Sequence, residues 1–380
     1  MMLISRRHLL RRLGGGAVVS AAIPVIRESS FAGTTESLGT TQHGGPVRLN
    51  MNENAYGPSE RVTATMRASL SLVNRYPEAA GALVGEIAGL HAVKPEQVVL
   101  GCGSTEILRL AAATFLGRGK KLVVASPTFD PIIDYARRAG AEVTTVPLTK
   151  QYAHDLGAML AHADASTGLV YLCNPNNPTG SLTPRKDLET FIRKLPPTTR
   201  VLIDEAYHHY AGTSSAYASF IDRPVDDRRV VVTRTLSKIY GLAGLRLGYA
   251  IAAPAPAHQL SSMRSPMNVN VLALRGGVTA LDDREYVSLC VRRNADDRQE
   301  FYNQANARML RVIDSHANFV MLNTGGPAEA AIDHLRKNNI VVAPPILSMT
   351  KHIRVSLGKP HEMGEFWRVW DLMPPHTMEM

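Results

Sequence analysis

The sequence predicts an α/β protein in which a large domain with a mostly parallel sheet, sandwiched by helices, is followed by a smaller α+β domain. Short apolar runs alternate with longer helical patterns between residues 98 and 233, and a charged helical stretch begins near residue 269. Of the 380 residues, 45% are hydrophobic and 20% are charged, a balance typical of globular proteins. Strands that alternate with helices form parallel sheets covered on both faces.

The first 32 residues predict a twin-arginine export signal. Arg6 and Arg7 precede an apolar, glycine-rich run over residues 13–26, and Ser-Phe-Ala at 30–32 forms a small-x-small cleavage site. The run has 14 residues, fewer than the roughly 20 that a membrane-spanning helix needs. We therefore expect export to the periplasm, cleavage after Ala32 and no stable membrane anchor. An uncleaved amphipathic arm is the alternative.

The net charge of +9 is the feature that would favour a nucleic-acid or membrane partner. However, residues 1–32 hold five arginines against one glutamate, which leaves 37 basic and 32 acidic residues in the rest of the chain. The sequence has no basic block with interleaved aromatic residues and no basic helix of the groove-reading type. We therefore expect no nucleic-acid partner.

Changes in composition along the sequence also predict the domain boundaries. Residues 33–45 form a polar linker, and residues 46–75 are expected to join the small domain. The predicted large, cofactor-binding domain covers residues 76–268, and residues 269–380 supply a bridging helix and the rest of the small domain. The three cysteines are widely spaced and adjacent His208 and His209 lack a third ligand, so no disulfide framework and no metal site are expected.

The elements follow from the apolar runs. Strands are expected at 98–100, 121–125, 142–146, 168–172, 200–203 and 229–233, with helices at 104–116, 128–139 and 184–194. The tail predicts strands at 318–322, 340–342 and 352–357 around a helix at 328–337. Because ligands of such sheets bind beyond the carboxyl ends of the strands, the residues after each run are the candidate site.

Two of these strand ends have the residues of an anion site or a turn. Residues 101–106 (Gly-Cys-Gly-Ser-Thr-Glu) form a glycine-rich turn that opens a helix, and free N–H groups at a helix N-terminus bind phosphate. A turn with no ligand is the alternative. Residues 174–180 (Asn-Pro-Asn-Asn-Pro-Thr-Gly) contain three asparagines, which could also serve only in Asx turns.

The next two strand ends have an acid and a lysine. Asp204 follows four apolar residues, where an ionised carboxylate is expensive to bury unless a cation meets it. Lys238 stands among small and apolar residues, where the pKa of its amine would fall and the amine would become nucleophilic. A solvated surface lysine is the alternative when Lys238 is considered alone.

Together these motifs resemble the fold-type I, pyridoxal-phosphate-dependent class I/II aminotransferases, and within them the histidinol-phosphate aminotransferase-like branch. The resemblance extends from residues 49–58 (Leu-Asn-Met-Asn-Glu-Asn-Ala-Tyr-Gly-Pro) through residues 75–78 to residues 352–358. Its most specific motifs are residues 174–180 and residues 237–246 (Ser-Lys-Ile-Tyr-Gly-Leu-Ala-Gly-Leu-Arg).

The resemblance implies pyridoxal 5'-phosphate as the cofactor and assigns its binding residues. Lys238 is implied to be the Schiff-base lysine that also moves the proton, and Asp204 is implied to pair with the pyridinium nitrogen. Tyr207 and Asn177 are implied to hydrogen-bond the 3-oxygen of the ring. The other implied cofactor contacts are Phe129 on the ring face and, at the phosphate, Ser104, Thr105, Thr235, Ser237 and Arg246.

The same resemblance implies how the substrate and a second subunit meet this site. Tyr76 resembles the tyrosine that reaches the phosphate of the neighbouring subunit, so a homodimer with shared active sites is expected. Arg354 is implied to bind the substrate carboxylate through two hydrogen bonds. The motif at 49–58 adds Asn54 and Tyr56 as implied substrate-binding residues.

One departure from the family pattern concerns the substrate. In the histidinol-phosphate enzymes an arginine that helps to recognise the substrate phosphate commonly follows an Ile-x-Val segment, whereas Ala343 follows residues 340–342 here. A missing guanidinium removes one or two charge-assisted hydrogen bonds, each worth about 1.5–3 kcal/mol. Histidinol phosphate is therefore a nominal substrate of the expected reaction.

We predict an aminotransferase that moves an amino group between an amino acid or amine and a 2-oxo acid such as 2-oxoglutarate. A decarboxylase resembling the threonine-phosphate decarboxylases is the alternative within the same cofactor class, because one sequence does not show which substrate bond is held perpendicular to the ring. A non-catalytic protein that binds pyridoxal phosphate or amino acids is the alternative from another class.

Overall fold

The computed structural model describes residues 45–77, 80–222, 224 and 227–374. Residues 46–380 form one compact unit. The predicted export signal lies outside the described residues. Among the residues that are described, no helix is both long enough and apolar enough to cross a membrane.

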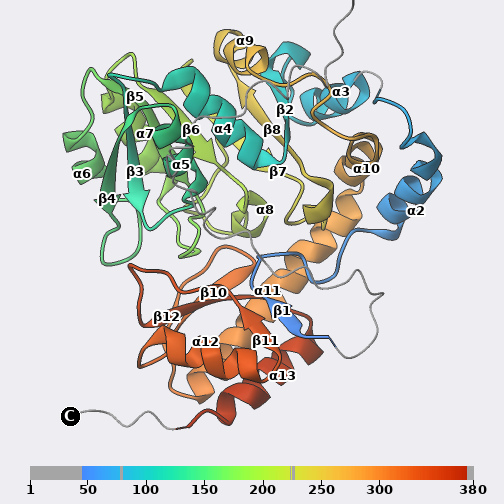
Figure 1. Ribbon diagram of the computed structural model, residues 1–380, viewed down its shortest axis with the longest axis vertical. Coiled ribbons are helices and arrows are strands. Elements are labelled where there is room, and N and C mark those ends of the chain that lie inside the picture. The colour runs from blue at the N-terminus through green and yellow to red at the C-terminus, as the bar shows by residue number, and fades with distance from the viewer. Residues whose placement is uncertain (1–44, 78–79, 223, 225–226, 375–380) are drawn as a thin grey trace, which may run out of the picture. The chain divides into compact units, whose positions relative to one another are not determined.

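A seven-stranded sheet forms the centre of the large domain (Figure 1). Its spatial order is β2-β8-β7-β6-β5-β3-β4, and every neighbouring pair is parallel except the two that include β8. The strands are β2 Val98–Cys102, β3 Lys121–Ser126, β4 Glu142–Pro147, β5 Thr167–Cys173, β6 Arg200–Asp204, β7 Val230–Thr235 and β8 Leu247–Ala252. The mostly parallel α/β architecture predicted from the sequence is confirmed.

Both faces of the sheet are covered by helices, because successive strand residues point to opposite sides. In β3, Val123 belongs to one apolar core, whereas Leu122 and Val124 belong to the core on the other face. The helices that accompany the sheet are α3 Gly81–Leu90, α4 Ser104–Phe115, α5 Pro131–Arg138, α6 Leu156–Ala161, α7 Arg185–Lys194, α8 His208–Ala211, α9 Pro254–Ser262 and α10 Val271–Asp282. Shorter 3-10 turns occur at η1 Leu70–Leu72, η2 Pro95–Gln97 and η3 Ala243–Leu245.

The small domain is an α+β unit. In one sheet β10 Phe319–Asn323 lies between β9 Val312–Ile313 and β12 His352–Ser356, with both pairings antiparallel. Near the start of the described chain, β1 Val47–Leu49 pairs in parallel with β11 Ile340–Val342. Helices α12 Ala328–Lys337 and α13 Pro360–Asp371 pack against these strands around a core that includes Phe366.

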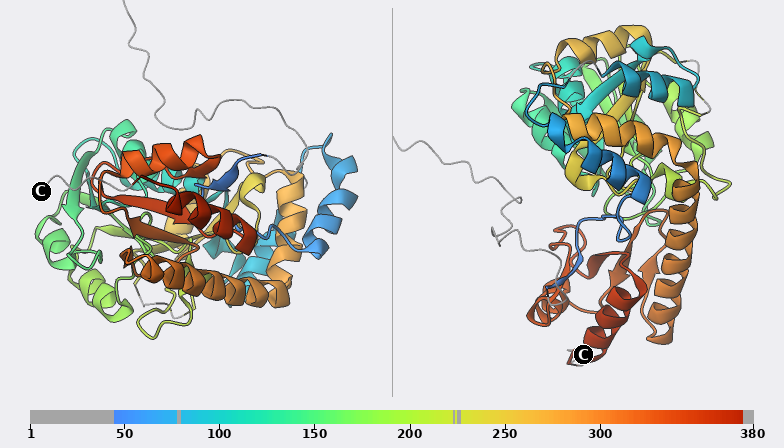
Figure 2. Two further views of the ribbon diagram at one scale, coloured as in Figure 1. Left: turned by 90° about the horizontal axis from the view of Figure 1, so that it is seen from below. Right: turned by 90° about the vertical axis from the view of Figure 1, so that its right-hand side faces the viewer.

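Helix α11, Arg284–Ala307, contacts α8 of the large domain and α13 of the small domain (Figure 2). The sequence predicted one helical stretch over about 269–310, and the structure corrects this prediction. Asp283 ends α10 and caps α11, since its side chain accepts a hydrogen bond from Tyr286 N at 3.3 Å. Helix α2, Glu60–Ala68, precedes the large sheet and contacts α10.

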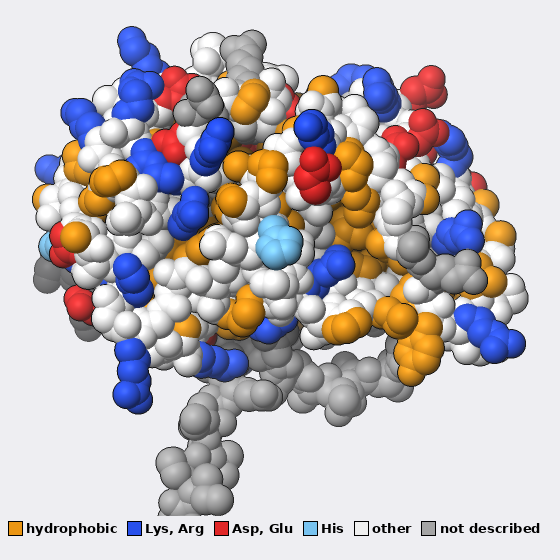
Figure 3. Space-filling model, turned by 90° about the horizontal axis from the view of Figure 1, so that it is seen from above, with side chains coloured by type: hydrophobic (Ala, Val, Ile, Leu, Met, Phe, Trp, Pro, Cys, Tyr) orange, Lys and Arg blue, Asp and Glu red, His pale blue; other side chains and the backbone are white. Residues whose placement is uncertain are grey.

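The basic side chains are dispersed over the face shown in Figure 3, where uncharged and acidic side chains separate them. Several of the arginines in the described chain form ion pairs with nearby acids, such as Arg308 with Asp371 at 2.6 Å.

Candidate active site

Part of the predicted site comes from the carboxyl ends of three adjacent strands. Asp204 is the last residue of β6, and Thr235 is the last residue of β7. The loop at 174–180 directly follows β5, whose Cys173 is paired in register with Asp204. Because β5, β6 and β7 run parallel, their polar ends meet at one edge of the sheet.

Asp204 is a buried carboxylate without a cationic hydrogen-bond partner in the described chain. It is 2% exposed, and it accepts hydrogen bonds from the Tyr171 hydroxyl at 2.9 Å and from Ala206 N at 3.0 Å. Burial raises the pKa of Asp204 to about 6, although the Tyr171 hydrogen bond opposes this rise. The carboxylate is thus placed to meet a cation that the described residues do not supply.

Lys238 lies in the loop after β7. Its Nζ donates to the backbone oxygen of Met51 at 3.2 Å and lies 5.8 Å from the centre of the Tyr207 ring. Burial, helped by the positive charge of Arg354, lowers the pKa of Lys238 to about 8. About a tenth of its amine is therefore neutral at pH 7, far more than for an ordinary lysine, and the neutral form is nucleophilic.

Arg354 connects β12 of the small domain to the large-domain loop at 174–180. Its Nη1 donates to Asn177 Oδ1 at 2.6 Å, and its Nη2 donates to Asn50 O at 2.9 Å. Its buried Nε has no hydrogen-bond partner among the described residues, and burial lowers the pKa of the guanidinium. The guanidinium therefore retains a donor for a further acceptor such as a carboxylate.

An anion cradle forms where α4 begins. Gly103 is the N-cap of α4, with φ at 74° and no side chain to cap the first N–H groups, which include that of Ser104. A Cβ on Gly103 would overlap the guanidinium of Arg246. The Arg246 Nη1 donates to Ser237 Oγ at 3.3 Å, and Thr235 Oγ1 donates to the same oxygen at 2.9 Å. Free N–H groups, hydroxyls and a guanidinium together suit a phosphate.

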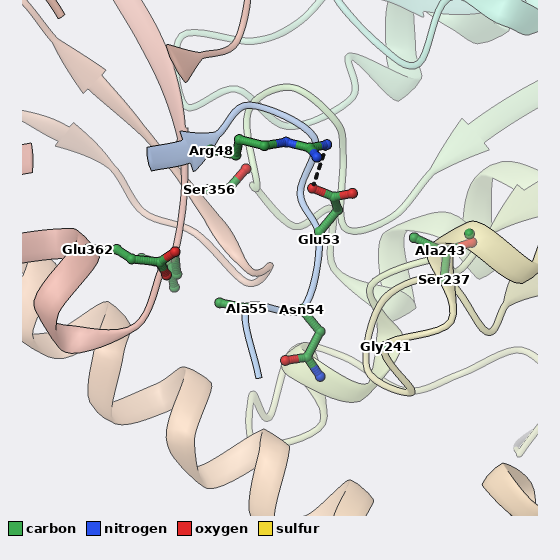
Figure 4. Close-up of a pocket in the computed structure, with 12 residues that line it drawn as sticks. Arg48, Glu53, Asn54, Ala55, Ser237, Gly241, Ala243, Ser356 and Glu362 are labelled. Carbon is green, nitrogen blue, oxygen red and sulfur yellow. Dashed lines mark ion pairs between the residues drawn. The ribbon is translucent and has the colours of Figure 1, made fainter. Parts of the chain in front are cut away.

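A cavity of about 310 Å³ lies beside this cluster (Figure 4). It is lined by residues of the segment after β1, by the loop that begins at Ser237 and by the end of β12 at Ser356. Arg48 and Glu53 form an ion pair of 3.5 Å on its wall and remain largely exposed. The cavity therefore has a polar wall drawn from both domains.

Asn54, Tyr56, Phe129 and Thr105 are four further predicted site residues with contacts of their own. Asn54 lines the cavity, but its amide donates to Ile239 O at 2.8 Å. The Tyr56 hydroxyl donates to Asp297 on α11 at 3.1 Å, so the structure does not bring this side chain to Lys238. Phe129 is half-buried after β3 and packs against the apolar core, and Thr105 is half-buried in the first turn of α4.

Tyr76 lies outside the cluster, with 83% of its surface exposed. Leu70 and Val73 on the same stretch are 55% and 59% exposed. The site formed by one chain therefore does not include Tyr76.

Two contributors were missed from the sequence. Tyr171 lies within the apolar strand β5 in register with Leu202, and its hydroxyl reaches Asp204 at 2.9 Å, a contact that no local sequence pattern indicates. Asn52 is part of the quoted motif at 49–58, and its Nδ2 donates to the Tyr207 hydroxyl at 3.1 Å. Its partner Ser356 lies 304 positions away in the chain, so no local pattern indicates this contact.

The adjacent histidines face each other. His208 Nε2 and His209 Nε2 are 3.1 Å apart, and burial lowers the pKa of both rings. Within the described ranges, no group of three or more His, Cys, Asp or Glu side chains could hold a metal ion.

Residues 45–368 match the family model described as aminotransferase class I and II. The chain belongs to the class I and II aminotransferases. It is 36% identical to the histidinol-phosphate aminotransferase of Symbiobacterium thermophilum, over 84% of this chain and 88% of that relative. It is 37% identical to histidinol-phosphate aminotransferase 2 of Carboxydothermus hydrogenoformans, with the same coverage.

Solved structures agree with this assignment. Histidinol-phosphate aminotransferase from Sinorhizobium meliloti, in complex with pyridoxal-5'-phosphate, superimposes with a TM-score of 0.80 at 25% identity, over 90% of this chain and all of that one. L-threonine-O-3-phosphate decarboxylase from Porphyromonas gingivalis reaches a TM-score of 0.74, over 86% of this chain and 98% of that one, but at 21% identity it shows the shared fold alone. The aminotransferase is thus favoured over the decarboxylase alternative.

The protein is a pyridoxal-phosphate-dependent transaminase of fold type I. The residues in the site fit this cofactor on two independent grounds. Asp204 is a buried carboxylate whose hydrogen-bond donors are a phenol and a backbone N–H, so it suits a protonated ring nitrogen. At Gly103, the absence of a side chain leaves the α4 N-terminus and Arg246 open to a phosphate.

Proposed function

We propose that Lys238, Asp204 and Tyr207 are the catalytic residues of this transaminase. When bound, pyridoxal phosphate supplies an electron sink that stabilises the carbanion formed at the substrate Cα. Asp204 keeps the ring nitrogen protonated, and its raised pKa is lowered again once a cation faces it. Tyr207 and Asn177 donate hydrogen bonds to the 3-oxygen of the ring, and Phe129 lies against the ring face.

Lys238 both holds the cofactor and moves the proton. Its lowered pKa keeps part of the amine unprotonated, so the amine would be able to accept and hold the proton from the substrate Cα. Among the described residues, the acceptor of the Lys238 hydrogen bond is a backbone oxygen, that of Met51. This single hydrogen bond is weak enough to let the Lys238 side chain move during turnover.

The cradle at the start of α4 holds the cofactor phosphate. The contributing groups in one chain are the N–H groups of Ser104 and Thr105, the hydroxyls of Thr235 and Ser237, and the guanidinium of Arg246. Charge-assisted hydrogen bonds of this type are each worth about 1.5–3 kcal/mol. The phosphate end therefore provides most of the non-covalent affinity and fixes the ring against Asp204.

The proposed substrates are an amino acid or an amine of the histidinol-phosphate type as donor and a 2-oxo acid such as 2-oxoglutarate as acceptor. Arg354 binds the carboxylate, since its Nε is buried and free to donate. Ala343 is 2% exposed and its N–H donates to Arg354 O at 3.2 Å, so this position next to β12 offers a methyl group. A substrate phosphate therefore has no guanidinium from position 343.

We infer that the active form is a homodimer in which Tyr76 completes the partner's phosphate site. The exposed aromatic and apolar side chains of residues 70–76 support this proposal, because a large apolar patch on a folded protein favours association. The test mixes a Tyr76→Phe chain with a Lys238→Ala chain. One site of each hybrid dimer then lacks both side chains and the other site has both, so activity should reappear on mixing. Absence of recovery in verified hybrids contradicts a shared site.

We further propose export through the twin-arginine pathway to the periplasm, supported by Arg6, Arg7 and the apolar run that follows. Cell fractionation and N-terminal sequencing test this proposal. The expected product is periplasmic and begins at Gly33, whereas an Arg6→Lys, Arg7→Lys chain should stay inside the cell. Equal export of the double variant contradicts the proposed route.

The observation that carries the catalytic proposal is the placement of Lys238 and Asp204 at the ends of adjacent strands, each with a pKa shifted by burial. Borohydride reduction of the loaded protein, followed by peptide mass spectrometry, should find the cofactor attached to Lys238. Lys238→Ala should show no attachment. Attachment at another lysine contradicts the assignment.

A further inference from the structure

Asn52 lies between β1 and α2, where it connects Tyr207 with the small domain. The residue is 2% exposed, and its backbone has a φ of 54°, in the left-handed region. Asparagine is one of the few residues that adopt this conformation readily. The position thus buries a primary amide at the boundary between the two domains, and a buried amide needs hydrogen-bond partners.

The contacts of Ser356 determine the direction of the hydrogen bond to Tyr207. The Asn52 backbone N–H donates to Ser356 Oγ at 2.8 Å, and the Ser356 hydroxyl donates to Asn52 Oδ1 at 3.1 Å. With Oδ1 engaged as an acceptor, Nδ2 faces the Tyr207 oxygen at 3.1 Å. In the reverse orientation the amide NH₂ would face Ser356 Oγ, and the Ser356 hydroxyl would lose Oδ1 as the acceptor of its proton. The network therefore makes Asn52 the donor and Tyr207 the acceptor.

A phenol that accepts one hydrogen bond donates its own proton more strongly to the next acceptor. No other described residue accepts the proton of the Tyr207 hydroxyl. The hydrogen bond from Asn52 lowers the pKa of Tyr207, against a larger rise caused by burial. The other titratable or charged groups that face Tyr207 are Arg354, which lowers this pKa, Cys173 and Asp204, which raise it, and Lys238 over its ring.

We propose that Asn52 is a positioning residue for the cofactor ring, because its amide holds the Tyr207 hydroxyl as a donor toward the 3-oxygen. The inference rests on the proposed role of Tyr207 and extends it to a residue with no contact to the reacting atoms. Ser356 of β12 holds Asn52 in place. A residue of the small domain therefore determines the direction of the hydrogen bond to Tyr207 in the large domain.

The test is a pH titration of the visible absorption band of the loaded protein. A strong hydrogen bond to the 3-oxygen stabilises its anionic form, so weakening this bond should raise the pKa of the band. Asn52→Gly keeps the left-handed backbone and removes the amide. We expect a rise of about half a pKa unit, because one neutral hydrogen bond limits the effect to roughly one unit. In a Tyr207→Phe background the same substitution should cause no shift.

Asn318→Ala is the matched control. The Asn318 amide donates to the backbone oxygens of Asn52 and Glu53 at 3.0 and 3.1 Å, so this variant loosens the same segment while the Asn52 amide is retained. Its band should titrate as in the unmodified protein. An equal shift in Asn318→Ala, or an undiminished Asn52→Gly shift in the Tyr207→Phe background, would overturn the inference. Absence of any band in the unmodified protein would instead overturn the proposed cofactor site.

Discussion

Asp204→Asn should stabilise the cofactor-free protein while it abolishes transamination. The two effects have one cause. A buried carboxylate that would face the cationic ring nitrogen lowers the stability of the folded protein when that cation is absent. Asparagine has the same shape, and its Oδ1 can still accept the hydrogen bond from Ala206 N. The Tyr171 hydroxyl can rotate to accept from the new amide.

The magnitude follows from the pKa of Asp204, which burial raises from 3.8 to about 6. One pKa unit corresponds to about 1.4 kcal/mol, so the ionised carboxylate destabilises the folded protein by about 3 kcal/mol above pH 6. The folded state binds the proton more tightly than the unfolded state. The penalty is therefore absent below pH 3.8, grows as the pH rises to about 6, and is complete above it.

Urea denaturation of the cofactor-free proteins at several pH values measures this effect. The Asn variant should gain about 3 kcal/mol at pH 8 and little at pH 4. Asp371→Asn is the control, because Arg308 holds the pKa of that exposed acid below its usual range, and its loss should reduce stability by less than about 1 kcal/mol. A gain that is independent of pH, or a loss of stability at pH 8, would refute the reasoning.

Three further substitutions test the site and its support. Arg354→Lys should raise the KM for the 2-oxo acid about tenfold, because an ammonium cannot form two parallel hydrogen bonds with a carboxylate; an unchanged KM contradicts this role. Gly103→Ala should weaken cofactor binding in equilibrium dialysis by at least about tenfold, because the new Cβ displaces Arg246. An unaltered affinity would contradict a phosphate site at the start of α4. Glu205→Gln should reduce the free energy of unfolding by about 3 kcal/mol in denaturant titration, since the buried Arg234 loses its buried anionic partner at 3.1 Å and keeps only the half-exposed Asp222 at 3.5 Å; a change below about 1 kcal/mol contradicts this.

The strands of the large sheet were predictable from the sequence where it has short apolar runs. All six predicted strands of the large domain are present. Inner strands such as β5 are buried along their whole length and need apolar sequences, whereas the edge strand β4 is largely exposed. Strand β8, Leu247–Ala252, was not predicted, since it follows directly after the glycine-rich loop motif and pairs antiparallel to both neighbours. The break between α10 and α11 at Asp283 was also missed, because the helical periodicity continues on both sides of it.

Local motifs predicted Lys238 and Asp204, but they did not predict the contacts between site residues that are distant in the sequence. The Arg354–Asn177 hydrogen bond joins residues 177 positions apart, and the contact of Asn52 with Tyr207 joins residues 155 positions apart. Such contacts depend on how the two domains close on each other, which strand and helix periodicity does not encode. Asn54 and Tyr56 show that a shared motif does not fix the contacts of its members. They belong to the same motif as Asn52, but their side chains donate hydrogen bonds to Ile239 O and Asp297.

Transfer of the donor's nitrogen decides the reaction itself. The protein loaded with pyridoxal phosphate is given a panel of ¹⁵N-labelled amino acids and amines together with 2-oxoglutarate, and mass spectrometry follows the label. An active donor should lose its nitrogen, yield ¹⁵N-glutamate and release no CO₂, and Lys238→Ala should transfer no label. Release of CO₂ with retention of the nitrogen on the donor, or label transfer that persists without the Lys238 amine, would contradict transamination at this site.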